Sequence, residues 1–381
     1  IVQALVMGLA GWPLYLIAVK KTKSKLFSLV LVVSYLLFSG IQYTITNEFH
    51  QSCFIPLILV GGIYFIESGK KKLGVITLLG LLLVREDMAL LLIALSFMYL
   101  LLLEKRMGLT LIVAGTAGFW FLLTVVLPGV SSQKEYVHYG YGDLGRTPGE
   151  VAINALKNPQ KTLELLISPE IKRKQVYNAL FSFGGLPLLH PIGLVPVVQQ
   201  YAVRFVDTRT THRWLDRNHY AAPIGPLMSL AIVNGVITLR RLLKVRNIKA
   251  YHITVSCYLL GAVLVSNLLL KNTIFALYKS QLYYTPDLVR NIDAIVGLVP
   301  ADAAVAANNS VFPHLSHRDK IYLLPELRDA AYVVIDLEDG PNKYSPLTYS
   351  EVEDLVHIMI ESKVWNVKRQ IGQAVLLKKA E

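Results

Sequence analysis

Residues 73–103, LGVITLLGLLLVREDMALLLIALSFMYLLLL, form an apolar run that is interrupted at its centre by three ionisable residues, Arg85, Glu86 and Asp87. The apolar residues on each flank predict a membrane helix. A charged side chain at the centre of a membrane helix costs roughly 2.5 to 3.5 kcal/mol on insertion scales. We therefore expect these three residues in a turn that meets water or in a functional site.

Two interpretations of this turn are open. In the first, the turn joins two membrane helices and is charged only because it meets water. In the second, it lies at a water-filled cleft, where Arg85 holds an anionic group and Glu86 or Asp87 orients or deprotonates a reactant. Which one applies depends on the other polar residues that reach the same membrane face.

The composition indicates a polytopic helical membrane protein. Hydrophobic residues make up 54% of the 381 residues, and the mean hydropathy is +0.47. Residues 1–280 hold 28 Lys and Arg against 12 Asp and Glu, whereas residues 281–381 hold 10 against 14. The net charge of +12 thus belongs to the membrane part, which argues against a nucleic-acid partner. Cys53 and Cys257 lie in or beside apolar runs, so we expect no disulfide framework.

The apolar runs predict about ten membrane segments. They lie at residues 2–19, 26–44, 53–66, 73–84, 88–103, 109–127, 180–206, 221–239 and 251–270. Basic loops at residues 20–25, 70–72, 105–106 and 240–249 are expected on the cytoplasmic side. All four share that side only if the run 180–206 enters and returns, so we predict a re-entrant hairpin that turns near His190 and is broken by its Pro and Gly residues. Because the chain begins at Ile1 within a helical run, we expect it to be a fragment that lacks its natural beginning.

With this topology the remaining polar residues gather on the outer face. The candidate residues there are Glu48, His50, Arg85, Glu86, Asp87, Arg209, Arg213, Arg217, His219 and Tyr220. A long outer loop, residues 128–179, opens polar and then becomes amphipathic. Its helical segments are expected to lie along the membrane surface, or else to be solvated connectors. Likewise, residues 207–220 could be a loop that contacts lipid headgroups and is stabilised by local ion pairs, and His50 could be a hydrogen-bonding group at a helix end.

An ordered set of motifs carries a family resemblance. The motifs are NEFH at 47–50, LVREDMAL at 83–90, YGDLG at 141–145 with PGE at 148–150, NHYAAP at 218–223, and VFPHLSHR at 311–318 followed by a strand. With these, the chain resembles the predicted membrane proteins grouped as domain of unknown function 2079, which are similar in architecture to the GT-C glycosyltransferases. Those enzymes take a sugar from a polyprenyl-phosphate carrier on the outer membrane face. Here Gln51 and Ser52 follow the Phe-His pair, where family members commonly have Pro-Glu.

The resemblance implies a GT-C-like bundle and a lipid-linked sugar as donor. Sugar transfer requires a cation to stabilise the departing phosphate and a carboxylate to activate the acceptor hydroxyl. Arg85 and the three arginines of residues 207–220 could supply the cation, and Glu86, Asp87 or Glu48 the carboxylate. The GT-C base lies in a first outer loop that this chain lacks, so no residue is assigned to that position.

Residues 281–381 predict a small extracytoplasmic α/β domain. A helix over 286–299 precedes three strand-like segments, an amphipathic helix over 349–362 and a closing hairpin. His314 and His317 have helical spacing, but the sequence shows no third ligand near them, so we predict no metal site.

The sequence thus leaves two kinds of function open. We predict a plasma-membrane glycosyltransferase that uses a polyprenyl-phosphate sugar. The alternatives are a transporter or lipid-handling protein, or a non-catalytic accessory subunit. A transporter would continue its polar residues through the membrane midplane and often shows repeated halves. The sequence shows no repeat, which favours the enzyme.

Overall fold

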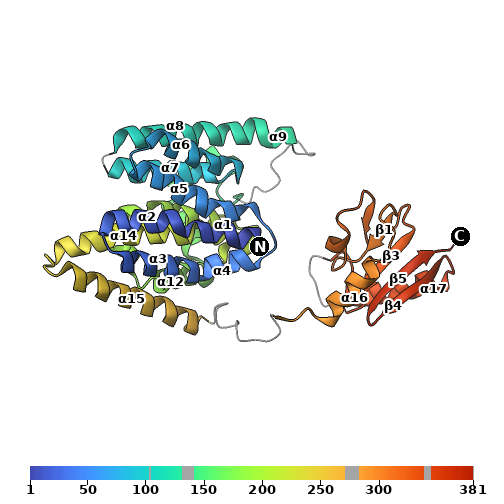
Figure 1. Cartoon of the computed structure of the whole chain (residues 1–381). Helices are drawn as coiled ribbons and strands as arrows, with labels where there is room; N and C mark the ends of the chain where they lie inside the picture. The colour runs from blue at the N-terminus through green and yellow to red at the C-terminus, as the bar shows by residue number, and fades with distance from the viewer. Residues whose placement is uncertain (103, 131–140, 271–282, 339–344, 381) are drawn as a thin grey trace. The chain divides into compact units, whose positions relative to one another are not determined.

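The computed structural model divides the chain into two compact units, Ile1–Ala276 and Leu277–Glu381 (Figure 1). It describes residues 1–102, 104–130, 141–270, 283–338 and 345–380. The opening of the predicted outer loop, at 131–140, lies outside this range, as does the predicted domain boundary at 280/281.

The first unit is helical. Its α-helices are α1 (Val2–Leu9), α2 (Gly11–Thr22), α3 (Lys25–Leu37), α4 (Ser39–Thr46), α5 (Ile55–Glu67), α6 (Lys71–Leu79), α7 (Met88–Leu101), α8 (Lys105–Phe121), α9 (Leu127–Val130), α10 (Pro148–Lys157), α11 (Pro159–Ile167), α12 (Glu170–Ser182), α13 (Val195–Phe205), α14 (Ile224–Leu242) and α15 (Ile248–Leu269). Short 3-10 turns connect several of them: η1 (Gln51–Phe54), η2 (Gly80–Leu83), η4 (Leu186–Leu189), η5 (Pro191–Leu194), η6 (Thr211–Trp214) and η7 (His219–Ala221).

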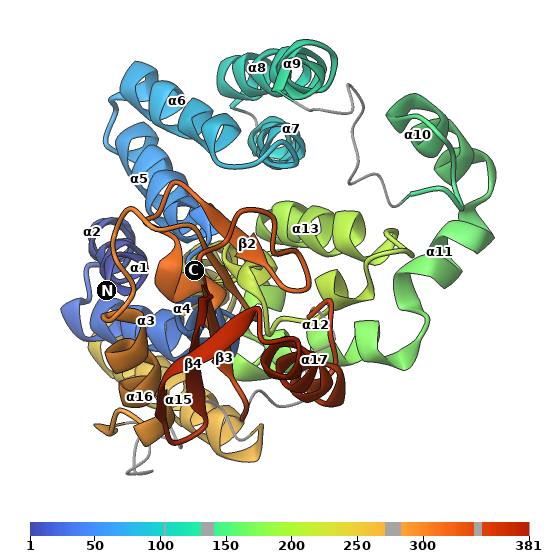
Figure 2. The same cartoon turned by 90° about the vertical axis from the view of Figure 1, so that its right-hand side faces the viewer.

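The turn at residues 85–87 separates η2 from α7, as the charge pattern predicts. The helix α7 packs along α8, and α5 along α6, in neighbouring antiparallel pairs (Figure 2). Contacts of Lys21 with Glu67 and Asn234, the Lys71–Glu104 ion pair and the turn between α14 and α15 place the basic loops 20–25, 70–72, 105–106 and 240–249 at one end of the bundle (Figure 1). We call this the basic end. The ion pair between Lys71 Nζ and Glu104 Oε2, at 3.1 Å, joins two of these loops.

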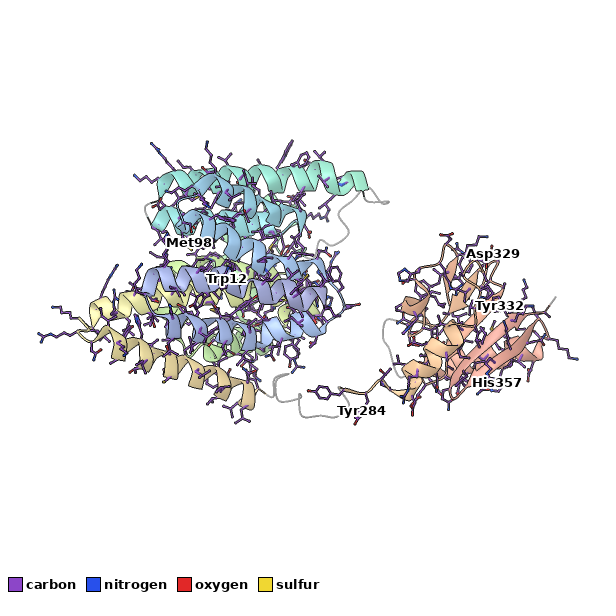
Figure 3. The ribbon with its side chains drawn as sticks, viewed as in Figure 1. Trp12, Met98, Tyr284, Asp329, Tyr332 and His357 are labelled. Carbon is purple, nitrogen blue, oxygen red and sulfur yellow. The ribbon has the colours of Figure 1, made fainter. Side chains whose placement is uncertain are left out.

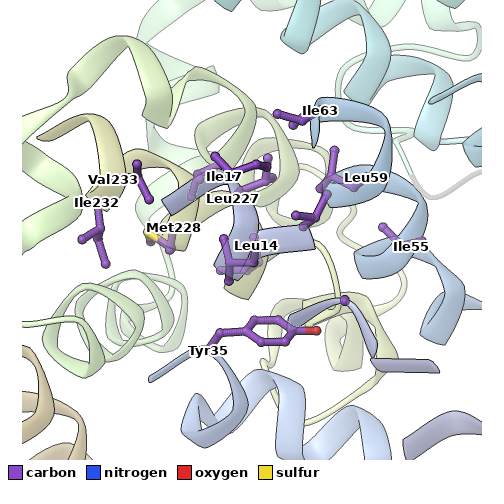
Figure 4. Packing of buried hydrophobic residues seen from close by; sticks show 14 of the residues in the cluster. Leu14, Ile17, Tyr35, Ile55, Leu59, Ile63, Leu227, Met228, Ile232 and Val233 are labelled. Carbon is purple, nitrogen blue, oxygen red and sulfur yellow. The ribbon is translucent and has the colours of Figure 1, made fainter. Parts of the chain in front are cut away.

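The core lies where α2, α3, α5 and α14 meet. Figure 4 shows Leu14, Tyr35, Leu59 and Met228 packed together from these four helices, and each is at least 99% buried. The one polar atom of this group is satisfied, because the Tyr35 hydroxyl donates a 2.9 Å hydrogen bond to the Met7 carbonyl. Apolar contact among helices separated by some two hundred residues therefore holds the bundle together.

Glycine permits the close approach of α5 and α6. A Cβ atom on Gly74 would lie 2.7 Å from the Gly62 carbonyl oxygen and 2.9 Å from the Ile66 nitrogen, both backbone atoms. We expect Gly74→Ala to force the helices apart and to cost about 1 to 3 kcal/mol of unfolding free energy. Chemical denaturation in detergent measures this cost. Gly61→Ala is the matched control, since nothing lies within 4 Å of its Cβ position. Equal stability of the two variants would contradict the close packing.

Three helices within the described ranges are long and apolar enough to cross a membrane: Val2–Thr22, Lys105–Gly129 and Ile248–Leu269. Two bent pairs, Lys25–Leu37 with Ser39–Thr46 and Thr211–Ala221 with Ile224–Leu242, raise this number to five. The predicted runs 53–66 and 88–103 lie in shorter apolar helices, Gln51–Glu67 and Met88–Leu101. The membrane character agrees with the prediction, whereas the number of about ten segments and their orientation stay predictions.

The run 180–206 folds as a broken helical hairpin between α12 and α13. Gly184 and Gly185 adopt φ values of +59° and +69°, a conformation that favours glycine. The two ends of the hairpin meet, because Lys172 Nζ in α12 donates a 2.7 Å hydrogen bond to the carbonyl of Phe205 in α13. The chain therefore turns back between α12 and α13. Its re-entry into a membrane stays a prediction.

The second unit is the predicted α/β domain. Its elements are α16 (Asp287–Val296), β1 (Val305–Ala307), η10 (Phe312–Leu315), β2 (Ile321–Leu323), β3 (Tyr332–Asp336), α17 (Tyr349–Glu361), β4 (Trp365–Ile371) and β5 (Ala374–Lys379). The sheet order is β2-β1-β3-β5-β4, with β1, β2 and β3 parallel and β4 and β5 an antiparallel hairpin. Figure 3 places Tyr332 on this sheet and His357 on α17. Each predicted helix and strand of the tail forms.

Candidate functional site

A polar pocket of about 250 Å³ lies where three turns of the first unit meet. Its lining residues are His50, Gln51, Arg85, Glu86, Thr210, Arg213, His219 and Tyr220. They come from the α4–η1 corner, from the turn before α7, and from the loop between α13 and α14. The structure therefore brings six of the ten candidate residues to one pocket and adds Gln51 and Thr210.

Arg85 is held by a carboxylate of its own turn. Its Nε donates a 2.8 Å hydrogen bond to Asp87 Oδ1, and its Nη2 donates to Asp87 Oδ2. The side chains of Arg85 and Asp87 are only 8% and 10% exposed. The third guanidinium nitrogen, Nη1, lies 3.3 Å from the Ser52 hydroxyl. Asp87 thus engages the Nε and Nη2 edge of the Arg85 guanidinium. The rest of the guanidinium group lines the pocket.

Arg213 lines the pocket from the loop between α13 and α14 and is held in the same way. Its Nη1 donates a 2.7 Å hydrogen bond to Asp207 Oδ2, and Asp207 is fully buried. Asp207 Oδ1 also accepts from the backbone N–H groups of Arg209 and Thr210, which fixes the turn. The Arg213 Nε is buried and has no hydrogen-bond partner among the described residues. A ligand oxygen or a water is the usual partner of such a buried donor.

One aromatic ring links the two arginines. The guanidinium carbons of Arg85 and Arg213 lie 5.0 Å and 5.2 Å from the centroid of the Tyr220 ring. Both distances are within the range of cation–π attraction. Tyr220 therefore sets the separation of two cationic groups that come from chain segments far apart in sequence.

His50 and His219 stack face to face, with ring centroids 3.4 Å apart and planes inclined by 8°. Burial lowers the pKa of His219 to about 3, with further lowering by His50, Arg85 and Arg213. Burial and Arg85 also lower the pKa of His50, while Glu48 opposes this shift. His50 Nδ1 accepts a 3.2 Å hydrogen bond from the Ser52 backbone N–H. Both rings are thus neutral near pH 7, and the pair adds no positive charge to the pocket.

The lowered pKa of His219 predicts a loss of stability in mild acid. An unfolded histidine takes up a proton below about pH 6.5, whereas folded His219 resists protonation down to about pH 3. The unfolded state therefore binds more protons in this window, and stability falls as the pH falls from 6.5 toward 3. Thermal unfolding at pH 8 and pH 5 should show a smaller pH effect in His219→Gln than in the wild type. His317→Gln, at an exposed histidine, should behave as the wild type.

Gln3 positions the His50 corner, and the sequence analysis missed it. Its side chain is 5% exposed and donates to the carbonyls of Thr44, at 2.5 Å, and Asn47, at 3.2 Å. Its Oε1 accepts a 3.1 Å hydrogen bond from the His50 backbone N–H. A lone polar residue in an apolar helix was the only available signal, because its partners are more than forty residues away.

Tyr201 and Arg204, which the sequence analysis missed, support the Arg213 wall, because Arg204 Nε donates a 2.7 Å hydrogen bond to the Arg213 carbonyl. Arg204 Nη2 donates a 2.8 Å hydrogen bond to Asp216 Oδ1, and the Tyr201 hydroxyl donates to Asp216 Oδ2 at 2.8 Å. Tyr141 lies near Arg213, Asp87, Asp207 and Glu86. Burial raises its pKa to about 12, an effect that Arg213 opposes and that Asp87 and Asp207 reinforce. The Arg204–Asp216 and Arg213–Asp207 ion pairs thus hold residues 207–220 in place.

The remaining candidates lie outside the lining of the pocket. Glu48, Arg209 and Arg217 are exposed, and Asp87 stands behind Arg85 as its partner. No group of three or more His, Cys, Asp or Glu residues that could hold a metal ion occurs within the described ranges.

The fold and the pocket together define a helical membrane protein with a polar site between its helix-connecting turns and a small α/β domain at its C-terminus. The model of a family described as a predicted membrane protein, domain of unknown function 2079, matches residues 1–346. The chain belongs to this family. A search of curated proteins finds no match.

Proposed function

We propose that the protein is a membrane glycosyltransferase that takes a sugar from a polyprenyl-phosphate carrier on the outer face of the plasma membrane. In this proposal Arg85 and Arg213 bind the phosphate of the donor, and Glu86 activates the acceptor hydroxyl. The C-terminal α/β unit is then extracytoplasmic. The observation that carries the proposal is the convergence of two arginines and a glutamate on one pocket from separate segments.

The two fixed arginines of the pocket support a phosphate ligand. Each arginine is held rigidly by a buried carboxylate, so little side-chain entropy is lost when an anion binds. Arg213 Nε is a buried donor that lacks a partner in the described structure. The two stacked histidines are neutral. They can therefore donate or accept hydrogen bonds beside the phosphate without adding charge to the pocket.

The immediate neighbours of the pocket residues support a lipid carrier. Phe49 precedes His50 and is 65% exposed, and Leu83 lies two residues before Arg85 and is 91% exposed. Apolar side chains this exposed mark surfaces that meet lipid or a partner. A ligand with a polar head and an apolar tail would contact both the polar pocket and these exposed apolar side chains.

Asp87 is a poor choice for the base, because both of its oxygens are engaged by Arg85. Glu48 does not line the pocket. Glu86 lines the pocket together with both arginines. Of the three candidate carboxylates, it is therefore the one that can reach a substrate bound to the arginines.

The test uses the purified chain in liposomes that contain radiolabelled polyprenyl-phosphate glucose or polyprenyl-phosphate mannose. We expect saturable binding of at least one donor and loss of its sugar to a soluble acceptor. Movement of the intact lipid-linked sugar across the bilayer, without cleavage, would instead indicate a transporter. Absence of binding to either donor would contradict the proposal.

A further inference from the structure

A second cavity, of about 210 Å³, opens at the basic end of the bundle. It lies among α2, α5, α7, α14 and the tip of the hairpin at η5. Its polar lining residues are Lys21, Glu67, Tyr99, His190 and Asn234. None of them belongs to the pocket described above, which is formed by the turns at the other ends of these helices.

The polar groups of this cavity have unused hydrogen-bond donors. Lys21 Nζ donates to Glu67 Oε1 at 2.7 Å and to Asn234 Oδ1 at 3.2 Å. An ammonium group has three N–H donors, so one is left over among the described contacts. His190 Nδ1 accepts a 2.9 Å hydrogen bond from the Gly193 backbone N–H, which leaves Nε2 to carry the ring proton. The cavity therefore offers donors to an acceptor-rich ligand.

The remaining walls are apolar. Figure 4 shows Ile17, Ile63 and Leu227, which contribute to the lining from α2, α5 and α14. Met98, labelled in Figure 3, adds a wall from α7. A small inorganic anion would leave these walls without contact, whereas a ligand with an apolar part would cover them.

The surrounding charge selects an anion. The basic loops 20–25, 70–72, 105–106 and 240–249 carry many Lys and Arg residues, and the acidic residues beside them are Glu67 and Glu104. Clustered charge of one sign concentrates ligands of the opposite sign. Basic pockets between membrane helices are known to hold the headgroups of anionic lipids.

We infer that this cavity binds an anionic phospholipid, with Lys21 and His190 donating to the phosphate, the glycerol and first acyl carbons against the apolar walls, and the acyl chains extending into the surrounding membrane. In the bound state, the phosphate and the Glu67 carboxylate both accept hydrogen bonds from Lys21 Nζ. This site stands independently of the proposed sugar transfer, because it uses different residues at the basic end.

The experiment places the full chain in nanodiscs of phosphatidylcholine, with and without phosphatidylglycerol. Native mass spectrometry counts the retained phosphatidylglycerol, and thermal unfolding measures the stabilisation. The test variant is Lys21→Met combined with Glu67→Gln, which removes the cation without leaving a buried carboxylate unpaired. We expect about a tenfold loss of phosphatidylglycerol affinity, the effect of one lost charge-assisted hydrogen bond.

The matched control is Lys71→Met combined with Glu104→Gln. It removes a lysine–glutamate pair from the same end of the bundle, but one whose side chains are 57% and 54% exposed. This control should keep the wild-type affinity. An equal loss of phosphatidylglycerol affinity in both double variants would show that general surface charge causes the effect. It would overturn the proposed site. Stabilisation of the same size by inorganic phosphate, in phosphatidylcholine alone, would overturn the assignment to a lipid.

Discussion

Glu86→Gln is expected to lower sugar transfer by roughly a hundredfold to ten-thousandfold, the usual contribution of a general base. The substitution keeps the size of the side chain and removes only its charge and basicity. Glu86 lines the pocket beside Arg85, so it is the carboxylate that an acceptor hydroxyl would meet. Donor binding should change little, because in the proposal the arginines bind the phosphate.

The measurement is sugar transfer and donor binding in the same liposomes. Glu48→Gln is the control, since Glu48 is an exposed carboxylate on the corner that carries His50 and does not line the pocket. Full transfer by Glu86→Gln would exclude Glu86 as the base. Loss of transfer in both variants would indicate that the overall charge of this surface matters rather than one carboxylate.

Arg85→Met is expected to destabilise the protein by about 3 to 5 kcal/mol, the cost of leaving a buried carboxylate without its partner. Asp87 is 7% exposed, and both of its oxygens accept hydrogen bonds from Arg85. Loss of donor binding in this variant alone would therefore be ambiguous, because partial unfolding also abolishes binding.

The double variant Arg85→Met with Asp87→Asn resolves this ambiguity. It removes both charges, so we expect it to recover most of the lost unfolding free energy. Donor binding should remain at least tenfold weaker, because a charge-assisted contact to the phosphate is absent. Chemical denaturation and donor binding measure the two effects separately. A stable double variant that binds the donor as the wild type does would remove Arg85 from the phosphate site.

The helical bundle and the tail domain were predictable because their signals are local. Long apolar runs, basic loops and the charged turn at residues 85–87 each lie within one short stretch of chain. The strands and helices of the second unit follow from alternation and helical spacing over fewer than fifteen residues. The hairpin of residues 180–206 was predictable from its Pro and Gly residues together with the positive charge of the loop that follows.

The partners of the polar residues were not predictable in the same way. Nothing near Arg213 in the sequence indicates that its guanidinium shares the Tyr220 ring with Arg85, and nothing near Gln3 indicates that it holds the backbone of His50. Asp87 was a candidate base from its position in the turn. The structure instead makes it the counter-ion of Arg85, since the side chain two residues away folds back over it.

The sequence by itself determined that this is an apolar, multi-helix membrane protein with basic loops and a charged turn between its apolar runs, because burial of apolar area and the cost of charge in hydrocarbon are set by the local sequence. Only the tertiary structure decided which charges neutralise one another and which face a pocket. Electrostatic energy depends on the distances between charged groups, and the fold sets these distances between segments roughly two hundred residues apart in sequence.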